Sequence, residues 1–570
     1  MKKKSVLVIF GEKLPRKNKA WRQQFDEVLG EEELKKIVRP GSVQEAYRLA
    51  TEIPKLVVAG GKKVSKLVDY KGYDLWWVYF DSIYYNLCLP FTQYRNLLEY
   101  LKNFEEIHLF EPPCPDLFRY FLEAYNRKCT VLKRFRLRQL LPVPFGVFLQ
   151  ILLSFGFLPL LMITRPRVMV WTGDKFDLPH DYDFRMKFIY EELRKRKIPF
   201  VEFIRSLERW PIVLRHAWQR KRPVFYSAAV ILLIYSLAGL FKKKKEREIA
   251  DLCASPEPEK RFWLLIATRS LRSVQGTILS IQIIRFILRL IGVKVANISA
   301  GCDRTFHELL ACKLNNIKTI GIEHGAVPKY FFISDFMPGF DGKKQLSVDY
   351  YGVWSKWWKD YYLKNGNAYT EDQLFVSGPM RPLMERKYPA KECLDQNENH
   401  LKVLYISEGV AVPEEVLPYI LTLLESRDFK PCFKFRPYRD DLESWLKEEQ
   451  PEVYKKILET TTVFRGTMEE TISQCDVVVG SYSTAVLEAL LQLKIPIFFR
   501  TNKWGDYFDI KAGGFDSFFA ENPSELVERI KKSSKIPKED LKKLQEQFFG
   551  NPYQNGSAWV VDQIEKFLKI

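Results

Sequence analysis

Paired cysteines, a long apolar leader and nucleic-acid-binding motifs are all missing from this chain of 570 residues. Its nine cysteines are scattered and include no Cys-x-x-Cys pair, so neither a zinc site nor a disulfide framework is expected. Such cysteines are typical of small core residues in a reducing cytosol. The first residues, Met-Lys-Lys-Lys-Ser, run straight into a strand-like stretch, and we expect no secretion signal. The length indicates two or three domains, without internal repeats.

The chain has fewer acidic than basic residues: it contains 70 Asp and Glu residues and 89 Lys and Arg residues, which gives a net charge of +19. This charge predicts an anionic partner, which nucleic acid, anionic lipid or a phosphorylated substrate would all satisfy. The basic residues cluster at Lys133, Arg134, Arg136 and Arg138, just before an apolar run, and at Lys242–Lys245, just after another. That placement favours an anionic membrane surface, and we expect no nucleic-acid partner.

Two segments carry no charge, residues 139–164 and 223–241, and each is long enough to cross a bilayer as a helix. If both crossed, residues 165–222 would be exported with fifteen Lys and Arg residues, which the positive-inside rule opposes. Prolines and glycines also interrupt both runs. We therefore favour interfacial or re-entrant membrane-binding helices, with a spanning hairpin and buried core helices as alternatives. Core packing accounts for a third apolar helix, Thr277–Ile291.

Short apolar strands alternate with amphipathic helices through most of the chain, which predicts an α/β fold with parallel sheets. The rhythm divides the chain into an N-terminal α/β region, 1–135, a middle domain, 136–342, and a last domain, 343–570, closed by a helix near Ala558–Phe567. Strands expected in the first region are Ser5–Phe10, Leu56–Ala59, Leu75–Phe80, Ile107–Phe110 and Thr130–Leu132. Those expected in the last domain are Tyr351–Trp354, Leu374–Val376, Lys402–Ile406, Pro431–Phe435, Thr461–Phe464, Val477–Val479 and Ile497–Phe499.

The most informative segment runs from Asp476 through a buried strand that ends at Gly480, with a helix beginning near Ser483 or Thr484. The connecting loop places small hydroxyl side chains beside the unpaired N–H groups of the helix start, an arrangement suited to phosphate. Simple N-capping by Ser481 or Ser483 is the alternative. Glu488, one helical turn after Thr484, is expected to face the same ligand.

This segment resembles the second domain of bacterial capsule-type glycosyltransferases, sialyltransferases with a Ser-Thr motif and CDP-glycerol glycerophosphotransferases. Four further pieces match in order: Thr319-Ile-Gly-Ile-Glu-His-Gly-Ala, Tyr351-Gly-Val-Trp-Ser with Val376-Ser-Gly-Pro-Met-Arg, Val403-Leu-Tyr-Ile-Ser-Glu-Gly, and Phe433-Lys-Phe-Arg-Pro-Tyr. The resemblance covers about 300 to 565. It implies two Rossmann-like domains facing a cleft (GT-B-like), with acceptor on 136–342 and nucleotide-sugar donor on 343–570.

The resemblance also implies residue roles. The expected donor-binding residues are Ser481, Ser483, Thr484, Glu488, Arg436, Arg381, Gly378 and Glu408, the last contacting base or ribose. His324 or Glu323 would bind or deprotonate the acceptor hydroxyl, although His324 is equally explained as a turn histidine. Two departures stand out, because Arg436 replaces a family histidine and Glu323 a glutamine. Arginine still binds phosphate but transfers no proton.

Other acidic residues are weaker candidates. Asp303 and Glu308 are possible bases, but a helix cap or a surface position explains each better. The only Asp-x-Asp, Asp181 to Asp183, lies outside the last domain, so the metal-dependent transferase class loses support. We expect no metal and no cofactor, since the nucleotide-sugar is a substrate.

The resulting hypothesis is a membrane-associated glycosyltransferase for capsule or other cell-envelope polysaccharide biosynthesis. It would move sugar from a nucleotide-activated donor to a lipid-linked or growing polysaccharide acceptor, as a peripheral or monotopic protein at the cytoplasmic face of the cell membrane. Three alternatives stay open: a CDP-polyol phosphotransferase of the same fold, a nucleotide-sugar 2-epimerase-like isomerase, and a non-catalytic membrane scaffold.

Overall fold

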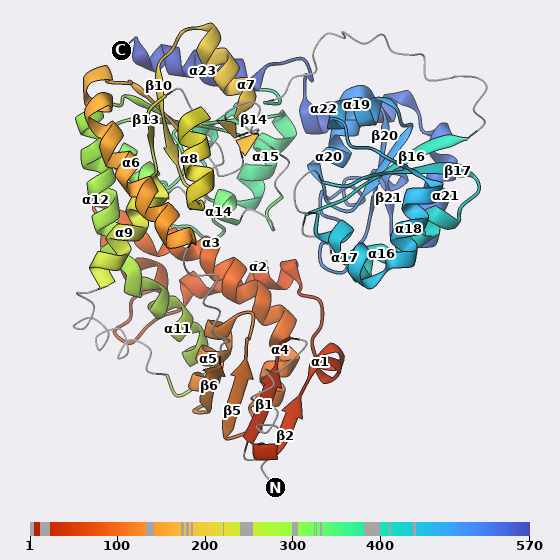
Figure 1. Cartoon of the computed structure of the whole chain (residues 1–570), viewed down its shortest axis with the longest axis horizontal. Helices are drawn as coiled ribbons and strands as arrows, with labels where there is room; N and C mark the ends of the chain where they lie inside the picture. The colour runs from red at the N-terminus through yellow and green to blue at the C-terminus, as the bar shows by residue number, and fades with distance from the viewer. Residues whose placement is uncertain are drawn as a thin grey trace.

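The computed structural model contains three parallel β-sheets, each with helices packed on it, and Figure 1 shows the three units side by side. The residues that it describes are 5–11, 23–132, 142–172, 176–177, 182–183, 186–219, 222–239, 255–298, 306–323, 325, 328–330, 333–380, 400–409, 412–436 and 440–569. The α/β class with parallel sheets, predicted from the alternation of strands and helices, is confirmed.

The N-terminal sheet has four parallel strands in the order β2-β1-β5-β6. Their bounds are Ser5–Ile9 for β1, Glu27–Leu29 for β2, Glu106–Phe110 for β5 and Lys128–Leu132 for β6. The helices are α1 (Glu31–Ile37), α2 (Val43–Glu52), α4 (Leu89–Leu101) and α5 (Pro115–Ala124). Three predicted strands are therefore confirmed, and β2 was missed.

Two other strand predictions in this region are wrong. Leu75–Tyr79 forms a 3-10 helix, and Leu56–Ala59 contributes only an isolated bridge between Val57 and Lys63. Trp76, Trp77 and Phe80 are all fully buried, so this stretch lacks the solvent-facing alternation of a half-buried strand. A short apolar run that is buried on every side gives no periodicity with which to distinguish strand from helix.

The central sheet has seven parallel strands in the order β11-β10-β7-β12-β13-β14-β15. Their bounds are Val168–Thr172 (β7), Phe200–Ile204 (β10), Val224–Phe225 (β11), Val295–Ile298 (β12), Lys318–Ile322 (β13), Tyr350–Val353 (β14) and Leu374–Val376 (β15). The chain runs outward from β7 in one direction and from β12 in the other. The topological switch point therefore lies between β7 and β12, a usual place for ligands in such sheets.

The division expected at residue 342 does not match this sheet. β14 pairs with β13 through Ile320 and Tyr350, and β15 pairs with β14, so both strands extend the central sheet. The C-terminal helix α23 (Gly556–Leu568) also packs there, with Val560 and Ile564 in one cluster with Ile320 (Figure 1). The Gly- and Pro-rich stretch after β13, which includes the short helix α14 (Ile333–Phe336), thus lies between two strands of one sheet, and the first strand of the next sheet begins at Leu401.

The C-terminal sheet has six parallel strands in the order β18-β17-β16-β19-β20-β21. Their bounds are Leu401–Ile406 (β16), Phe429–Lys434 (β17), Thr462–Val463 (β18), Val477–Gly480 (β19), Ile495–Phe499 (β20) and Phe519–Ala520 (β21). Helices α16 (Pro413–Glu425), α17 (Asp441–Glu449), α18 (Pro451–Thr460) and α21 (Pro523–Lys532) cover it. The switch point lies between β16 and β19.

The first predicted apolar segment forms helix α6 (Pro142–Thr164). The second, 223–241, is only partly helical, because Val224–Phe225 is strand β11 of the central sheet and α9 covers Ser227–Gly239. Helices α6 and α9 pack with α8 (Trp210–Gln219) and α12 (Val274–Ile291) on one side of the central unit (Figure 1). By length and composition, Phe145–Thr164 and the run Pro258–Ile291 are each able to cross a membrane. Several large apolar side chains of α6 are exposed, among them Phe145, Phe148 and Ile163.

Candidate functional site

The strand, loop and helix expected around residue 480 are present at the carboxyl end of the C-terminal sheet. β19 ends at Gly480, and α20 (Thr484–Leu487) continues as a 3-10 helix over Glu488–Gln492. Ser483 caps this helix, with its Oγ accepting from the Ala485 N–H at 3.2 Å. Ser483, Thr484 and Glu488 are only partly buried, so their side chains lie near the surface of the site.

The N–H groups of this loop already have a hydrogen-bond acceptor within the chain. Glu408, just after β16, accepts hydrogen bonds on Oε1 from the N–H groups of Ser481 (2.8 Å), Tyr482 (2.7 Å) and Ser483 (2.9 Å). The Ser481 hydroxyl donates to the other carboxylate oxygen. Burial raises the pKa of the Glu408 carboxyl, and these hydrogen bonds act in the opposite direction. A carboxylate thus fills the cradle in which we expected donor phosphate, and Glu408 faces the loop instead of a base or ribose.

Glycine at position 480 is necessary for this arrangement. A Cβ there would lie 3.0 Å from Glu408 Oε1 and 2.7 Å from the Val486 side chain. The carboxylate bridges the ends of β16 and β19, the two strands that flank the switch point. Glu408 therefore organises the loop at the position where this sheet is expected to hold its ligand.

Arg436, expected to bind phosphate, lies beside the same loop. It follows β17, and its backbone N–H donates to Asp440 Oδ2 at 2.6 Å. A Cβ on Gly409 would lie 1.9 Å from Arg436 Nη1, so the guanidinium covers the glycine that follows Glu408. The structure thus brings Arg436, Glu408 and the Ser481–Thr484 loop together, and the guanidinium adds a fixed positive charge.

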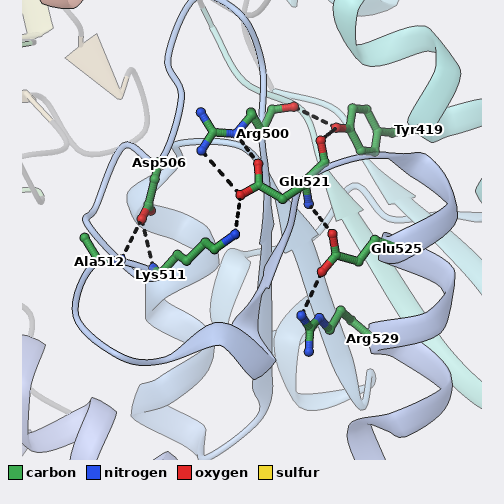
Figure 2. Close-up of polar contacts among 8 residues, drawn as sticks. All are labelled: Tyr419, Arg500, Asp506, Lys511, Ala512, Glu521, Glu525 and Arg529. Atoms are coloured by element: carbon green, nitrogen blue, oxygen red, sulfur yellow. Dashed lines mark hydrogen bonds and ion pairs between the residues drawn. The ribbon is translucent and has the colours of Figure 1, made fainter.

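A charged network that the sequence did not reveal anchors the next loop of this edge (Figure 2). Glu521 accepts from Arg500 and from Lys511 Nζ, the latter at 2.7 Å. Glu525 receives the Glu521 N–H at 3.0 Å. The loop that starts at Arg500 carries Trp504, whose ring centroid is 4.9 Å from that of Tyr482. The network therefore supports the site indirectly, because it anchors the loop that packs Trp504 against Tyr482.

The end of β13 faces the C-terminal sheet. Gly325 lies beside the helix start, because a Cβ on it would be 3.4 Å from Thr484 Oγ1. The turn after β13 and the helix start after β19 are thus neighbours. His324 itself lies outside the described residues.

Glu323, the other candidate base, is buried beneath this turn. Its Oε2 accepts from the Trp354 N–H at 3.2 Å, and its backbone carbonyl accepts from Trp354 Nε1 at 2.8 Å. Burial raises the pKa of its carboxyl well above the ordinary value. Burial thus favours the protonated form of Glu323, and its described contacts to Trp354 show it supporting the turn.

Gly378 has a left-handed φ of +77° and contacts Gln554 at the start of α23. The Gly556 N–H donates to the Pro379 carbonyl at 3.0 Å, so this turn receives the C-terminal helix and does not reach the Ser481 loop through any described contact. Arg381, Asp303 and Asp181 lie outside the described residues, and Asp183 belongs to the two-residue strand β9 (Tyr182–Asp183). Among the described residues, no group of acidic, Cys and His side chains is arranged to hold a metal.

Glu308, expected at a cap or on the surface, is instead buried on α13 (Phe306–Lys313). Burial raises the pKa of its carboxyl to about 7, with the Ser227 hydroxyl and the Trp171 indole beside it. Within the described chain, buried polar atoms without a hydrogen-bond partner gather near the central switch point, at Trp171, Thr172, Asn297 and Glu308.

No family model and no curated protein matches this chain. Among solved structures, it is similar to S. aureus MnaA with UDP, at 14% identity and TM-score 0.40, covering 70% of this chain and 96% of that one. The UDP-GlcNAc 2-epimerase from Neisseria meningitidis bound to UDP-GlcNAc has 13% identity and TM-score 0.40, covering 71% and 100%. MurG from Acinetobacter baumannii has 13% identity and TM-score 0.40, covering 70% and 99%.

Proposed function

We propose that this protein is a nucleotide-sugar-dependent glycosyltransferase with its donor on the C-terminal sheet and its acceptor on the central sheet. The observation that carries the proposal is the contact between the Gly325 turn and Thr484. Through it, the carboxyl ends of two parallel sheets meet at the edges where such sheets bind ligands. A donor and an acceptor held on opposite sides of this contact would be positioned for transfer.

The donor side offers a fixed cation and small hydroxyls around a rigid loop. Arg436 lies over Gly409, and Ser483 and Thr484 are partly exposed at the helix start. A guanidinium forms charge-assisted hydrogen bonds to phosphate oxygens, and it would stabilise the leaving nucleotide without a proton transfer. Since Glu408 takes the loop N–H groups, we assign phosphate contacts to the side chains of Arg436, Ser483 and Thr484.

The acceptor side is polar at the central switch point. Within the described chain, the Asn297 side-chain amide is buried without a hydrogen-bond partner, and a hydroxyl-rich ligand would relieve that desolvation cost. Sugar hydroxyls both donate and accept, which suits an amide. A polysaccharide or lipid-linked sugar acceptor therefore fits this edge.

Membrane association is part of the proposal. The uncharged helices α6 and α9 belong to the central unit, which holds the acceptor side. An acceptor linked to lipid resides in the bilayer, so a transferase that acts on it works at the membrane surface. We place the protein at the cytoplasmic face, where nucleotide-sugars are available, and assign it to cell-envelope polysaccharide synthesis.

Calorimetry with CMP, CDP, UDP and GDP tests the donor site. The Ser483→Ala/Thr484→Ala variant should weaken the preferred nucleotide by more than about 1 kcal/mol, because two hydroxyl contacts are lost. Thr467→Ala is the matched control, since Thr467 caps α19 (Met468–Ser473) in the same domain through its own hydroxyl. Failure of all four nucleotides to bind well-folded protein would remove the main support for a transferase.

A further inference from the structure

Helix α8 presents an unusual exposed stripe. Trp210, Leu214 and Trp218 are 42%, 47% and 90% exposed. Their spacing of four residues places them on one side of the helix, and Val213 and His216 are buried on the other side. Two tryptophans on one solvent-facing stripe are unusual for a soluble surface and mark an interaction face.

The stripe continues onto α6. Phe145, Phe148 and Leu152 are 55%, 54% and 51% exposed. The Phe145 ring centroid lies 6.2 Å from that of Trp210 and 6.5 Å from that of Phe148. The two helices therefore share one apolar surface, which we name the α6–α8 face.

One side of helix α6 is hydrogen-bonded to the rest of the central unit. Gln150 Nε2 donates to the Ser206 carbonyl at 2.8 Å, and Ser154 Oγ accepts from the Tyr226 N–H at 2.9 Å. Near the C-terminal end of the helix, Leu161 is fully buried. One side of α6 is thus occupied by protein along its length, so the helix presents only its other side to lipid.

Charge indicates what covers the face. Residues 142–172 and 209–239 contain no Asp or Glu. Arg165 and Arg167 are exposed just after α6, and Arg209 and Arg215 are exposed at α8. A second copy of this chain would bring the same arginines together and repel, whereas anionic headgroups would neutralise them.

We propose that the α6–α8 face is a monotopic docking surface that enters the headgroup–acyl boundary of an anionic bilayer without crossing it. Trp210 and Trp218 are the interfacial anchors, because indole rings favour that depth. This surface is where the proposed membrane-associated transferase would meet the bilayer. The biological reason for membrane binding rests on the proposed function, whereas the surface itself follows from its exposed side chains and its charge.

Sedimentation of the full chain with vesicles tests the face. The vesicles are phosphatidylcholine alone or phosphatidylcholine mixed with phosphatidylglycerol. We expect strong binding only to the mixed vesicles, and a loss of about tenfold or more for Phe148→Ser/Trp218→Ser. The control is Leu458→Ser/Tyr553→Ser, which removes apolar side chains that are 49% and 60% exposed but lie outside the face, and binding should be unchanged.

Depth is tested by lipids brominated at shallow or deep acyl positions, comparing the protein with Trp218→Phe. We expect shallow bromines to quench the Trp218 contribution. The proposal would be overturned by stronger quenching from deep bromines, or by equal binding to both kinds of vesicle. It would also be overturned if Phe148→Ser/Trp218→Ser bound vesicles as well as the parent, or if the parent formed dimers that this double variant does not form. Nucleotide binding in solution is measured on the same variants, so a failed docking surface is distinguished from a failed donor site.

Discussion

Glu408 and Glu323 are both buried carboxyls that follow a parallel strand, and the donors around them differ. Glu408 accepts from three backbone N–H groups and a hydroxyl, which favour its ionised form. Glu323 accepts from one N–H group, and its other oxygen has no partner within the described residues, which favours the protonated form. Neither contact involves a residue close in sequence, so spacing alone did not predict these roles.

Glu308 gives a pH-dependent prediction. Its carboxyl keeps its proton in the folded protein up to about pH 7, whereas its ordinary pKa is 4.5. Unfolding therefore releases a proton between these values, and stability falls as pH rises through that window. Relative to Glu308→Gln, the protein should lose about 2.5 kcal/mol of stability between pH values of about 5 and 8. Parallel stability–pH curves for the two proteins, from denaturant unfolding, would contradict the burial of an ionisable Glu308.

Arg436 and Gly409 are predicted to act together. Arg436→Ala should weaken nucleotide binding by about 1.5–3 kcal/mol, the usual value of a hydrogen bond to a charged group. Gly409→Ala should have a similar effect, because its Cβ would displace the guanidinium. Calorimetry with the preferred nucleotide measures both variants. Arg427→Ala, which removes an exposed arginine of the same domain, is the control, and an equal loss there would indicate general electrostatics only.

At the scale of elements, the positions of most strands and helices could be predicted from the sequence. The sheet that each strand joins could not. The strands around β16 to β20 and the helix start at Thr484 follow from buried β-branched runs and hydroxyl caps. β14 and β15 have the same local pattern, yet they pair with β13, because pairing depends on contacts between segments distant in sequence. The pairing of Glu408 with Ser481 spans 73 residues and was hidden for the same reason.

Helix α23 yields an element-scale prediction. Val561 is fully buried against the central sheet, so Val561→Asp should destabilise the central unit by at least ~3 kcal/mol. Hydrogen exchange should then quicken in β12 and β13, while β16 and β19 stay protected. The control is Lys566→Asp, which places the same side chain on the exposed side of that helix. It should change neither the stability of the central unit nor the exchange rates of β12 and β13. Quickened exchange in the C-terminal sheet alone would contradict the assignment of α23.

Across the whole molecule, helix α22 (Lys538–Phe549) contacts both the C-terminal unit and the central unit. Gln545 donates to the Leu490 carbonyl in the C-terminal unit, and Trp358 Nε1 of the central unit donates to the Phe548 carbonyl at 2.9 Å. The chain thus returns from the C-terminal unit to the central unit before it ends in α23. The same two units also meet where Gly325 lies beside Thr484, and the exposed α6–α8 face belongs to the central unit, on which we propose the acceptor binds.

The most direct test of the central claim follows the sugar. The full chain is incubated with anionic vesicles that contain lipid extract and with labelled nucleotide-sugars, and the products are separated into lipid, polymer and soluble fractions. We expect label in the lipid or polymer fraction, together with release of free nucleotide. In Ser483→Ala/Thr484→Ala, both the labelled product and the free nucleotide should be lost. Label that stays on the nucleotide as an altered sugar, formed equally without acceptor, would contradict transfer and establish an isomerase.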